Sequence, residues 1–585
     1  MTRSPSASRT VDPITFEVVR NALSSIADEM ALVILRSAYS PVVRDAMDYS
    51  TAVCDRQGQV VAQGLTLAVQ LGSFPDVMEV LLREFRDDMV PGDIFICNDP
   101  YGSGGQHLPD LYVIKPLFVD GAVHGYAATM AHHSDVGGIA PGSVAIHATE
   151  IYQEGLRLPL LKLYEAGEPD RKLFRIIEKN TRSPVQVLGD LRAQLAACRI
   201  AERGFGQLVD RYGVTELETY LEELHDFAET RMRAEIGRIP DGTYRFVDWI
   251  DGVGDEPERL PIAVTVTVDR DEIALDFAGS AGQVLAAINC PMAMVRSAAY
   301  CAIRCLATDD IPNCEGYMRP IRMSAPAGTI VNPVEPAACA ARGVIGYRVF
   351  DAIMGAIAEA VPELVIAGCE GGPTLFSVGG HHEGKPFVLT EVLVSTWGAR
   401  AARDGVEGIS NPAANLSNQP VELIEAELPL EVTRYGLVPD SGGAGKHRGG
   451  LASVREFRFL AERSEFTIRT DRRAHPPYGI AGGRPGAPSA NTMIDRDGDH
   501  EVETMPLKSF IARRDDLFRM VSAGGGGYGD PRERDPTAVL EDVREEKLTR
   551  AAARDVYGVV ITEEGALDVA ATRALRGDRV SEAAP

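Results

Sequence analysis

The chain has 585 residues, 45% of them hydrophobic, and its 59 basic and 84 acidic residues give a formal net charge of −25. This charge argues against nucleic acid and anionic membranes as partners, because both repel an acidic protein. The apolar content can build a large core, yet no apolar run is long enough to span a bilayer. The nine cysteines form no Cys-x-x-Cys pair and the N-terminus shows no signal peptide, so we expect a cytoplasmic protein.

The N-terminal part of the chain predicts helices and a hairpin. Residues 1–12 are polar and are expected to be disordered. Apolar residues at helical spacing follow from Pro13, which suits the first turn of a helix. Residues 51–63 alternate around a turn and predict a hairpin directly after Asp48, and residues 75–89 predict a second helix. The carboxylate of Asp48 is either a solvated turn residue or a metal ligand.

The stretch from residue 98 to 138 concentrates potential metal ligands. Four of the 11 histidines lie here, in the set His107, Asp110, His124, His132, His133 and Asp135. Two predicted strands joined by Asp120-Gly121 bring the loop before the first strand next to the end of the second. Two imidazoles and a carboxylate suit a divalent ion and leave positions open for water and substrate. The alternative is that these histidines cap turns and satisfy backbone groups.

His132 and His133 cannot both face one site if their segment is extended. Successive side chains of a strand point to opposite faces. Only one of the two is therefore expected to bind the ion, while the other lies in the core or supports a ligand.

The remainder of the chain changes from helical to β-rich near residue 239. Two long helical stretches are predicted at 180–213 and 214–238, and Thr215-x-x-Glu218 is a start signal for the second. Alternating segments then predict a β meander, with Asp269-Arg270-Asp271 as one of its turns. We divide the chain into a metal-site region (13–238), a β-rich region (239–530) with helices at 291–307 and 343–361, and a polar helical tail (531–585). The predicted class is α+β, a large multi-layer subunit with β meanders, Gly-rich loops and long helices.

Two Gly-rich stretches are similar to nucleotide loops but lack their defining residues. In SGGAGKHRGG (441–450), Lys446 is followed by His447 where a phosphate loop needs Ser or Thr. In GGGGYG (524–529), Asp530-Pro531 follows where a dinucleotide-binding helix should already run. We expect tight turns or subunit contacts there, so the chain offers no recognisable place for ATP.

Several long motifs occur in a fixed order from about residue 13 to 560. They are DYS (48–50), PGDIFICNDPYGSGGQHLPD (91–110), AHHSDVGG (131–138), TEIYQEGLRLP (149–159), NTRSPVQVLGDLRAQ (180–194), ARGVIGYRVFDA (341–352), LPLEVTRYGLVPDSGGAGKHRGG (428–450) and GGGGYGDPRERDP (524–536). Together they resemble the hydantoinase B family. This family comprises the B subunits of ATP-dependent hydantoinases and 5-oxoprolinases and the matching subunits of acetone and acetophenone carboxylases.

The resemblance implies a division of labour between two subunits. ATP is held by an A-type partner, which phosphorylates a carbonyl or amide oxygen of the substrate, and the B-type chain completes the reaction at a divalent metal, here zinc, manganese or iron. A hetero-oligomer of the (AB)n type is expected. By the same resemblance the metal ligands fall on Asp48, His107, Asp110 and His132. Proposed catalytic roles fall on His133 and Asp135, which would orient a ligand or move a proton, and on Glu154 and Arg157, which would line the substrate pocket.

One departure from the family pattern lies near the expected pocket, where Gln70 replaces the usual histidine. It bears on the substrate more than on the reaction. The leading interpretation is an ATP-dependent hydrolase of hydantoins, 5-oxoproline or lactams. Two alternatives remain open, a subunit of an acetone- or acetophenone-type carboxylase that acts on ketones, and a non-catalytic scaffold for the A-type partner.

Overall fold

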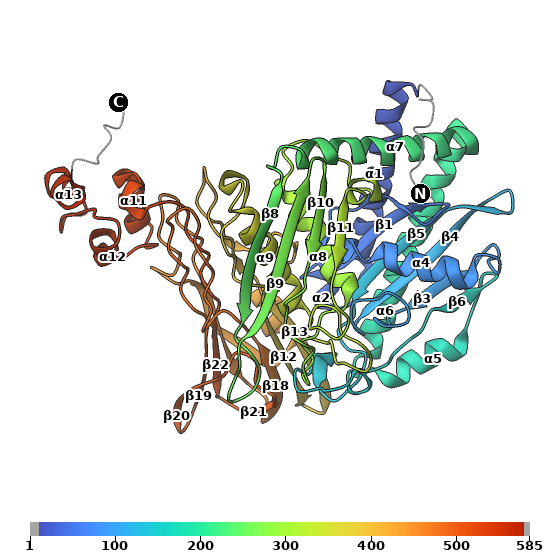
Figure 1. Cartoon of the computed structure of the whole chain (residues 1–585). Helices are drawn as coiled ribbons and strands as arrows, with labels where there is room; N and C mark the ends of the chain where they lie inside the picture. The colour runs from blue at the N-terminus through green and yellow to red at the C-terminus, as the bar shows by residue number, and fades with distance from the viewer. Residues whose placement is uncertain (1–10, 578–585) are drawn as a thin grey trace.

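The structure is a computed structural model that describes residues 11–577. The disorder predicted for residues 1–12 lies outside the described residues, apart from Val11 and Asp12, the latter of which caps the first helix. Figure 1 shows long helices packed on several sheets, which confirms the α+β class. In the described part of the chain, no helix is both long and apolar enough to cross a membrane.

The N-terminal region is built on a seven-stranded antiparallel sheet of order β2-β1-β5-β4-β3-β6-β7. Its strands are β1 (Tyr49–Asp55), β2 (Val60–Gln63), β3 (Ile94–Cys97), β4 (Asp110–Val119), β5 (Ala122–His132), β6 (Leu161–Glu165) and β7 (Glu168–Pro169). The predicted hairpins at 51–63 and around Asp120-Gly121 are both present. The central strands are buried on both faces, because helices cover the sheet on either side.

The helices of this region are α1 (Pro13–Ser37), α2 (Pro41–Arg44), α3 (Ala68–Leu71), α4 (Phe74–Phe85), α5 (Arg171–Asn180), α6 (Pro184–Tyr212) and α7 (Val214–Ile236). Helix α4 packs on one face of the sheet, and α1 and α6 pack on the other. The start signal at Thr215 is wrong: α7 already begins at Val214 and has Gly213 as its N-cap. The reason is that the positive φ of Gly213 turns the chain sharply out of α6, which leaves no residue for a side-chain cap.

The middle of the chain adds a four-stranded sheet of order β11-β10-β9-β8. The meander β8 (Gly242–Ile250), β9 (Leu260–Asp269) and β10 (Glu272–Asp276) is as predicted, whereas β11 (Ile321–Ser324) adds a parallel edge that the pattern did not show. The predicted helices are α8 (Met292–Leu306) and α9 (Gly343–Ile357). One apolar core joins α1 to α9, so the proposed boundary at residue 238 runs through shared packing.

Two further sheets pack face to face in the C-terminal part. One has the order β13-β12-β18-β21 and the other the order β16-β17-β22-β19-β20. Phe376 lies between them and stacks on Phe457 and Phe518 at 5.2 and 5.6 Å between ring centroids. The strands are β12 (Thr374–His382), β13 (Lys385–Leu393), β16 (Leu430–Leu437), β17 (Ser453–Phe459), β18 (Arg463–Arg469), β19 (Ala490–Asp495), β20 (Gly498–Glu501), β21 (Phe510–Arg513) and β22 (Leu517–Val521).

Short elements complete the chain. They are β14 (Ser395–Thr396), β15 (Glu407–Ile409), α10 (Val421–Glu427), and the 3₁₀ turns η1 (Pro141–Ser143), η2 (Ile151–Gln153), η3 (Glu315–Met318), η4 (Pro362–Leu364) and η5 (Pro531–Glu533). The helical tail consists of α11 (Pro536–Arg544), α12 (Arg550–Asp555) and α13 (Val569–Arg576), and Figure 1 places it at the far end of the molecule from α1.

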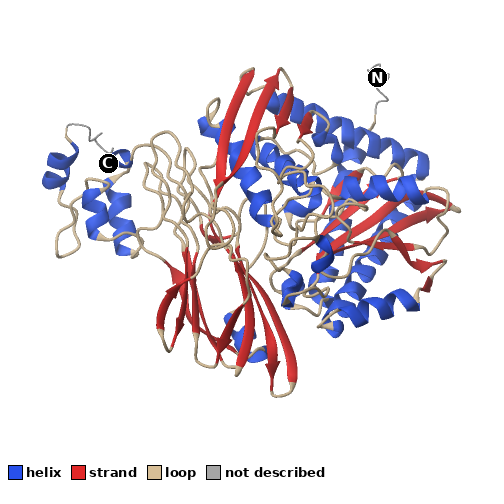
Figure 2. Cartoon of the chain, turned by 60° about the horizontal axis from the view of Figure 1, so that its bottom comes forward, coloured by secondary structure: helices blue, strands red, loops and turns tan. Residues whose placement is uncertain are grey.

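The Gly-rich segments pack against each other inside the chain. Figure 2 shows a group of loops between the C-terminal strands and the helices of the tail. The amide of Gly525 donates to Gly450 and that of Gly526 to Gly368. A Cβ on Gly449 would lie 1.9 Å from the carbonyl oxygen of Gly525. Glycine serves here to let backbones approach without side chains between them, whereas the expectation named only tight turns or subunit contacts. A role in subunit contacts stays a prediction.

Candidate metal centre

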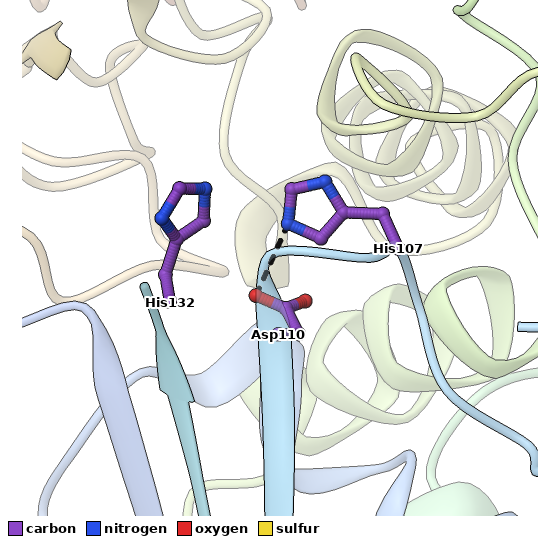
Figure 3. A group of neighbouring side chains, drawn as sticks. All are labelled: His107, Asp110 and His132. Atoms are coloured by element: carbon purple, nitrogen blue, oxygen red, sulfur yellow. Dashed lines mark ion pairs between the residues drawn. The ribbon is translucent and has the colours of Figure 1, made fainter. Parts of the chain in front are cut away.

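The β4–β5 hairpin brings three predicted ligands together. Asp110 begins β4 and His132 ends β5, and the two residues are direct partners across the ladder. His107 lies three residues before Asp110 and turns back toward it, with 3.1 Å between His107 Nε2 and Asp110 Oδ1. One donor atom from each of the three residues lies within 4.8 Å of the others, and Figure 3 shows the side chains converging. The local fold alone thus assembles two imidazoles and one carboxylate.

These donors are buried and unsatisfied. His107 Nε2 and Asp110 Oδ1 lie 3.1 Å apart but form no hydrogen bond, and neither of them nor His132 Nδ1 has a hydrogen-bond partner in the part of the chain that the structure describes. Buried polar atoms without partners are rare in folded proteins and each demands an explanation, of which an ion is one. Histidine nitrogens and a carboxylate oxygen match the donor preferences of zinc, manganese and iron. The residues present therefore fit a divalent cation.

The electrostatics keep the donors in the forms that bind a cation. Burial, followed by the neighbouring charge of Arg342, lowers the pKa of His107, and burial lowers the pKa of His132 to about 3. Both imidazoles are therefore neutral near pH 7 and carry a free lone pair. Burial alone would raise the pKa of Asp110, but the neighbouring charge of Arg342 opposes burial and the net effect is to lower it, so the carboxyl is ionised.

A segment far away in the sequence holds the ligands in place. The carbonyl oxygen of Ala340 accepts from His107 Nδ1 at 2.9 Å, which leaves Nε2 as the lone-pair nitrogen. Arg342 donates to Asp110 Oδ2 at 2.5 Å. Glu154 in turn accepts from the backbone amides of Cys339 and Ala340 at 2.6 and 2.7 Å. The segment 339–342 just before α9 thus orients two of the three ligands.

Asp48 lies beside this group without being part of it. It precedes β1, and its carbonyl oxygen accepts from the His132 amide at 3.0 Å. Its side chain lines the same cavity as His107 and His132, where Gln70 donates to it. Burial and the charge of Asp110 raise the pKa of Asp48 to about 7. Gln70, the departure from the family pattern, is therefore a direct partner of the fourth predicted ligand.

His133 faces the opposite side of β5 from His132. Its Nε2 lies 3.1 Å from Gln194 Oε1 on α6, and its amide donates to Pro109 at 2.8 Å. The side chain is buried between the sheet and α6 and does not line the cavity.

The other three predicted catalytic residues also make contacts away from the cavity. Both carboxylate oxygens of Asp135 are used, by Arg182 and by the amides of Gly137 and Gly142. Arg157 pairs with Asp99 at 2.8 Å and with Glu335 at 2.6 Å. Glu154 is fully buried against the 339–340 amides. In this conformation none of the three residues lines the cavity.

The site opens into a small cavity where three parts of the chain meet. Asp48, His107 and His132 come from the N-terminal sheet, Arg342 and Tyr347 from the start of α9, and Arg469 from the end of β18. The cavity has a volume of about 50 Å³. Water occupies about 30 Å³ in the liquid. The space therefore has room for water molecules.

Sequence reasoning did not single out Arg342, Tyr347 and Arg469. Arg342 and Tyr347 lie within the motif at 341–352, which was noted only as part of the family resemblance. Arg469 carries no local signal, because an arginine that ends a strand is ordinarily a solvated residue.

Comparison with known proteins decides the family. Residues 12–531 match the family described as Hydantoinase B/oxoprolinase. The chain belongs to this family. The resemblance seen in the motifs is thereby confirmed, and with it the prediction of an enzyme subunit of the hydantoinase type.

Relatives in the hydantoinase B family extend over nearly the whole chain. The B subunit of a putative D-/L-hydantoinase of Pseudomonas sp. (strain NS671) is 34% identical over 97% of this chain and 98% of its own length. The beta subunit of the caprolactamase of Pseudomonas jessenii is 33% identical over 97% of this chain and 99% of its own. Both are named as one subunit of a larger enzyme.

Solved structures confirm the fold. The crystal structure of ATP-dependent caprolactamase from Pseudomonas jessenii matches with a TM-score of 0.91 and 32% identity, covering 97% of this chain and all of that one. A nucleotide-free acetone carboxylase structure matches with a TM-score of 0.90, over 98% of this chain and 84% of that one. At 19% identity the second match shows the shared fold alone.

Proposed function

We propose that this chain is the metal-bearing B subunit of an ATP-dependent cyclic amide hydrolase that opens a hydantoin, 5-oxoproline or lactam ring. The observation that carries the proposal is the group of three buried, unpartnered donors on His107, Asp110 and His132. The hydantoinase and caprolactamase relatives support the substrate class. The proposal includes an A-type partner that binds ATP and phosphorylates the substrate oxygen.

The chain's own Gly-rich segments support an ATP site on the partner. Their backbones pack against one another, with the amide of Gly525 bonded to Gly450 and that of Gly526 to Gly368. A phosphate loop instead needs free backbone amides that point at the nucleotide. These segments therefore offer no phosphate cradle.

His107, Asp110 and His132 would hold the ion, and Asp48 is the proposed fourth ligand. A divalent ion in such a site supplies a Lewis acid that lowers the pKa of bound water and polarises an oxygen of the substrate. The protein fixes the geometry around it: the Ala340 carbonyl sets the tautomer of His107, and Arg342 keeps Asp110 ionised and oriented. A cation beside Asp48 would hold this carboxyl in its charged form.

The carboxylase and scaffold alternatives are weaker. The acetone carboxylase match shows the fold alone and says nothing about a ketone substrate for this chain. A scaffold has no use for three convergent donors that are buried without hydrogen-bond partners, since each unsatisfied buried group costs about 1–3 kcal/mol.

Metal analysis tests the proposal. The wild-type protein, purified without chelator and supplied with zinc or manganese, should hold about one divalent ion per chain, and the double variant His107→Ala/His132→Ala should hold none. His124→Ala is the matched control, because His124 lies on the same hairpin but pairs with Glu218 away from the cavity. Activity with the A-type partner, ATP and either lactams or ketones then separates hydrolase from carboxylase. Wild-type protein without stoichiometric metal would refute the metal-bearing role.

A further inference from the structure

Arg469 is a buried arginine that pairs with no carboxylate of the described residues. It is 6% exposed, its guanidinium donates to the Pro373 carbonyl at 2.6 Å, and its Nε has no partner within residues 11–577. Among the largest fully buried side chains are four other arginines, Arg348, Arg448, Arg455 and Arg472, and each of them pairs with at least one carboxylate. A buried charge normally requires such a partner, because removal from water is costly.

Arg469 lines the same cavity as three of the predicted metal ligands, Asp48, His107 and His132. Arg342 and Tyr347 line it as well. Burial lowers the pKa of Arg469 to about 10, so the side chain remains cationic near pH 7. Its unused donors are therefore available to a ligand that enters the cavity.

The charges around the cavity favour an anion once a cation is bound. Arg342 and Arg469 formally balance Asp48 and Asp110 when both carboxyls are ionised, and the two histidines are neutral. A divalent ion would then leave the cavity with a surplus of two positive charges. A phosphoryl group carries about −1.5 to −2 charges near neutral pH and would offset that surplus.

We propose that Arg469, assisted by the Tyr347 hydroxyl, binds an oxyanion of the substrate beside the metal centre, and that this oxyanion is the phosphoryl group of the activated amide. The proposal rests on the proposed function, which supplies the phosphorylated substrate. A planar guanidinium matches the oxygens of phosphate and of carboxylate equally well. A carboxylate of the substrate is therefore the second source of the same chemistry.

Anion binding by the metal-loaded protein tests the proposal. Titration calorimetry with inorganic phosphate and with acetate compares wild type, Arg469→Met and Arg463→Met. Arg463 is the matched control, since it is an exposed arginine at the other end of the same strand. Loss of a charge-assisted hydrogen bond predicts a roughly 10- to 100-fold weaker Kd for phosphate in Arg469→Met and no change in Arg463→Met.

The anion whose binding weakens in Arg469→Met identifies the substrate group that Arg469 binds. Weaker phosphate binding in Arg469→Met supports the phosphoryl group. Weaker binding of acetate alone assigns the pocket to a substrate carboxylate and overturns the phosphoryl assignment. Equal affinities of wild type and Arg469→Met for both anions would overturn the oxyanion pocket itself. Tyr347→Phe is a second, milder variant that should weaken phosphate binding several-fold while the guanidinium stays in place.

The same titration on chelator-treated protein separates this inference from the proposed function. If the protein never holds metal but anion binding still weakens in Arg469→Met, the oxyanion pocket is supported although the metal-bearing role has failed. If the protein holds stoichiometric metal but wild type and Arg469→Met bind both anions equally, the metal-bearing role stands and the oxyanion pocket is refuted.

Discussion

Glu154 gives the sharpest test of how the metal centre is held together. Its side chain is fully buried, and Oε1 alone accepts from the amides of Cys339 and Ala340. Burial raises the pKa of Glu154 to about 8, so the carboxyl is mostly protonated at pH 7. A neutral amide with the same shape should then replace it with little loss, whereas alanine should not.

The magnitude follows from the two amides. In Glu154→Ala both backbone N–H groups lose their acceptor inside the protein, at about 1–3 kcal/mol each, so we expect about 3–5 kcal/mol of lost unfolding free energy. In Glu154→Gln the Oε1 acceptor remains, and the loss should stay below about 1 kcal/mol. Because Ala340 also fixes His107, the metal affinity of Glu154→Ala should fall by about 10- to 100-fold.

Urea unfolding at pH 7 and metal competition with a chromophoric chelator measure both quantities. The Gln variant serves as the matched control for the Ala variant. If Glu154→Gln loses as much stability and metal affinity as Glu154→Ala, the negative charge of Glu154 is required and the neutral-acceptor explanation is refuted. If neither variant changes metal affinity, the 339–340 segment does not position His107.

Three further outcomes are expected. Metal affinity should increase from pH 6 to pH 8 in wild type but not in Asp48→Asn. The raised pKa of about 7 leaves Asp48 protonated at the lower pH, where it cannot bind a cation. Competition with a chelator across this pH range measures the affinity of both proteins. The metal-free protein should lose stability as pH rises from about 4 to about 7 and should level off above that, because burial raises the pKa of Asp48 to about 7 in the folded state while the unfolded carboxyl already ionises at about pH 4. A thermal melt in which Asp48→Asn shows the same pH slope would contradict this. Gly525→Ala should lower the free energy of unfolding by about 3 kcal/mol or more, measured in urea, since its Cβ would lie 2.2 Å from the carbonyl oxygen of Trp397. The control Gly436→Ala should be nearly neutral, because a Cβ there would meet nothing within 4 Å.

The sequence predicted those parts of the molecule that depend on neighbouring residues. Strand alternation around Asp120-Gly121 was sufficient to place Asp110 opposite His132, because a hairpin fixes its register through the turn. Helix α1 was found because its apolar residues recur at helical spacing. The family resemblance then selected which of the polar residues on this hairpin we predict to be ligands.

Residues brought in from distant segments were beyond such reasoning. Arg342 reaches Asp110 across 232 positions, and no spacing rule links the two. Arg469 arrives from a sheet that packs on the site only in three dimensions. The parallel strand β11 and the packed glycine segments were missed for a related reason, since both depend on partners that lie far along the chain.

The small volume of the cavity has a kinetic consequence. Pockets that enclose small organic ligands typically measure about 300–1,000 Å³. A cyclic amide therefore enters a cavity of about 50 Å³ only when its three walls separate. Turnover would then be limited by the opening of contacts between the N-terminal sheet, the start of α9 and β18. A phosphorylated intermediate enclosed by these walls would be shielded from bulk solvent for as long as those contacts hold.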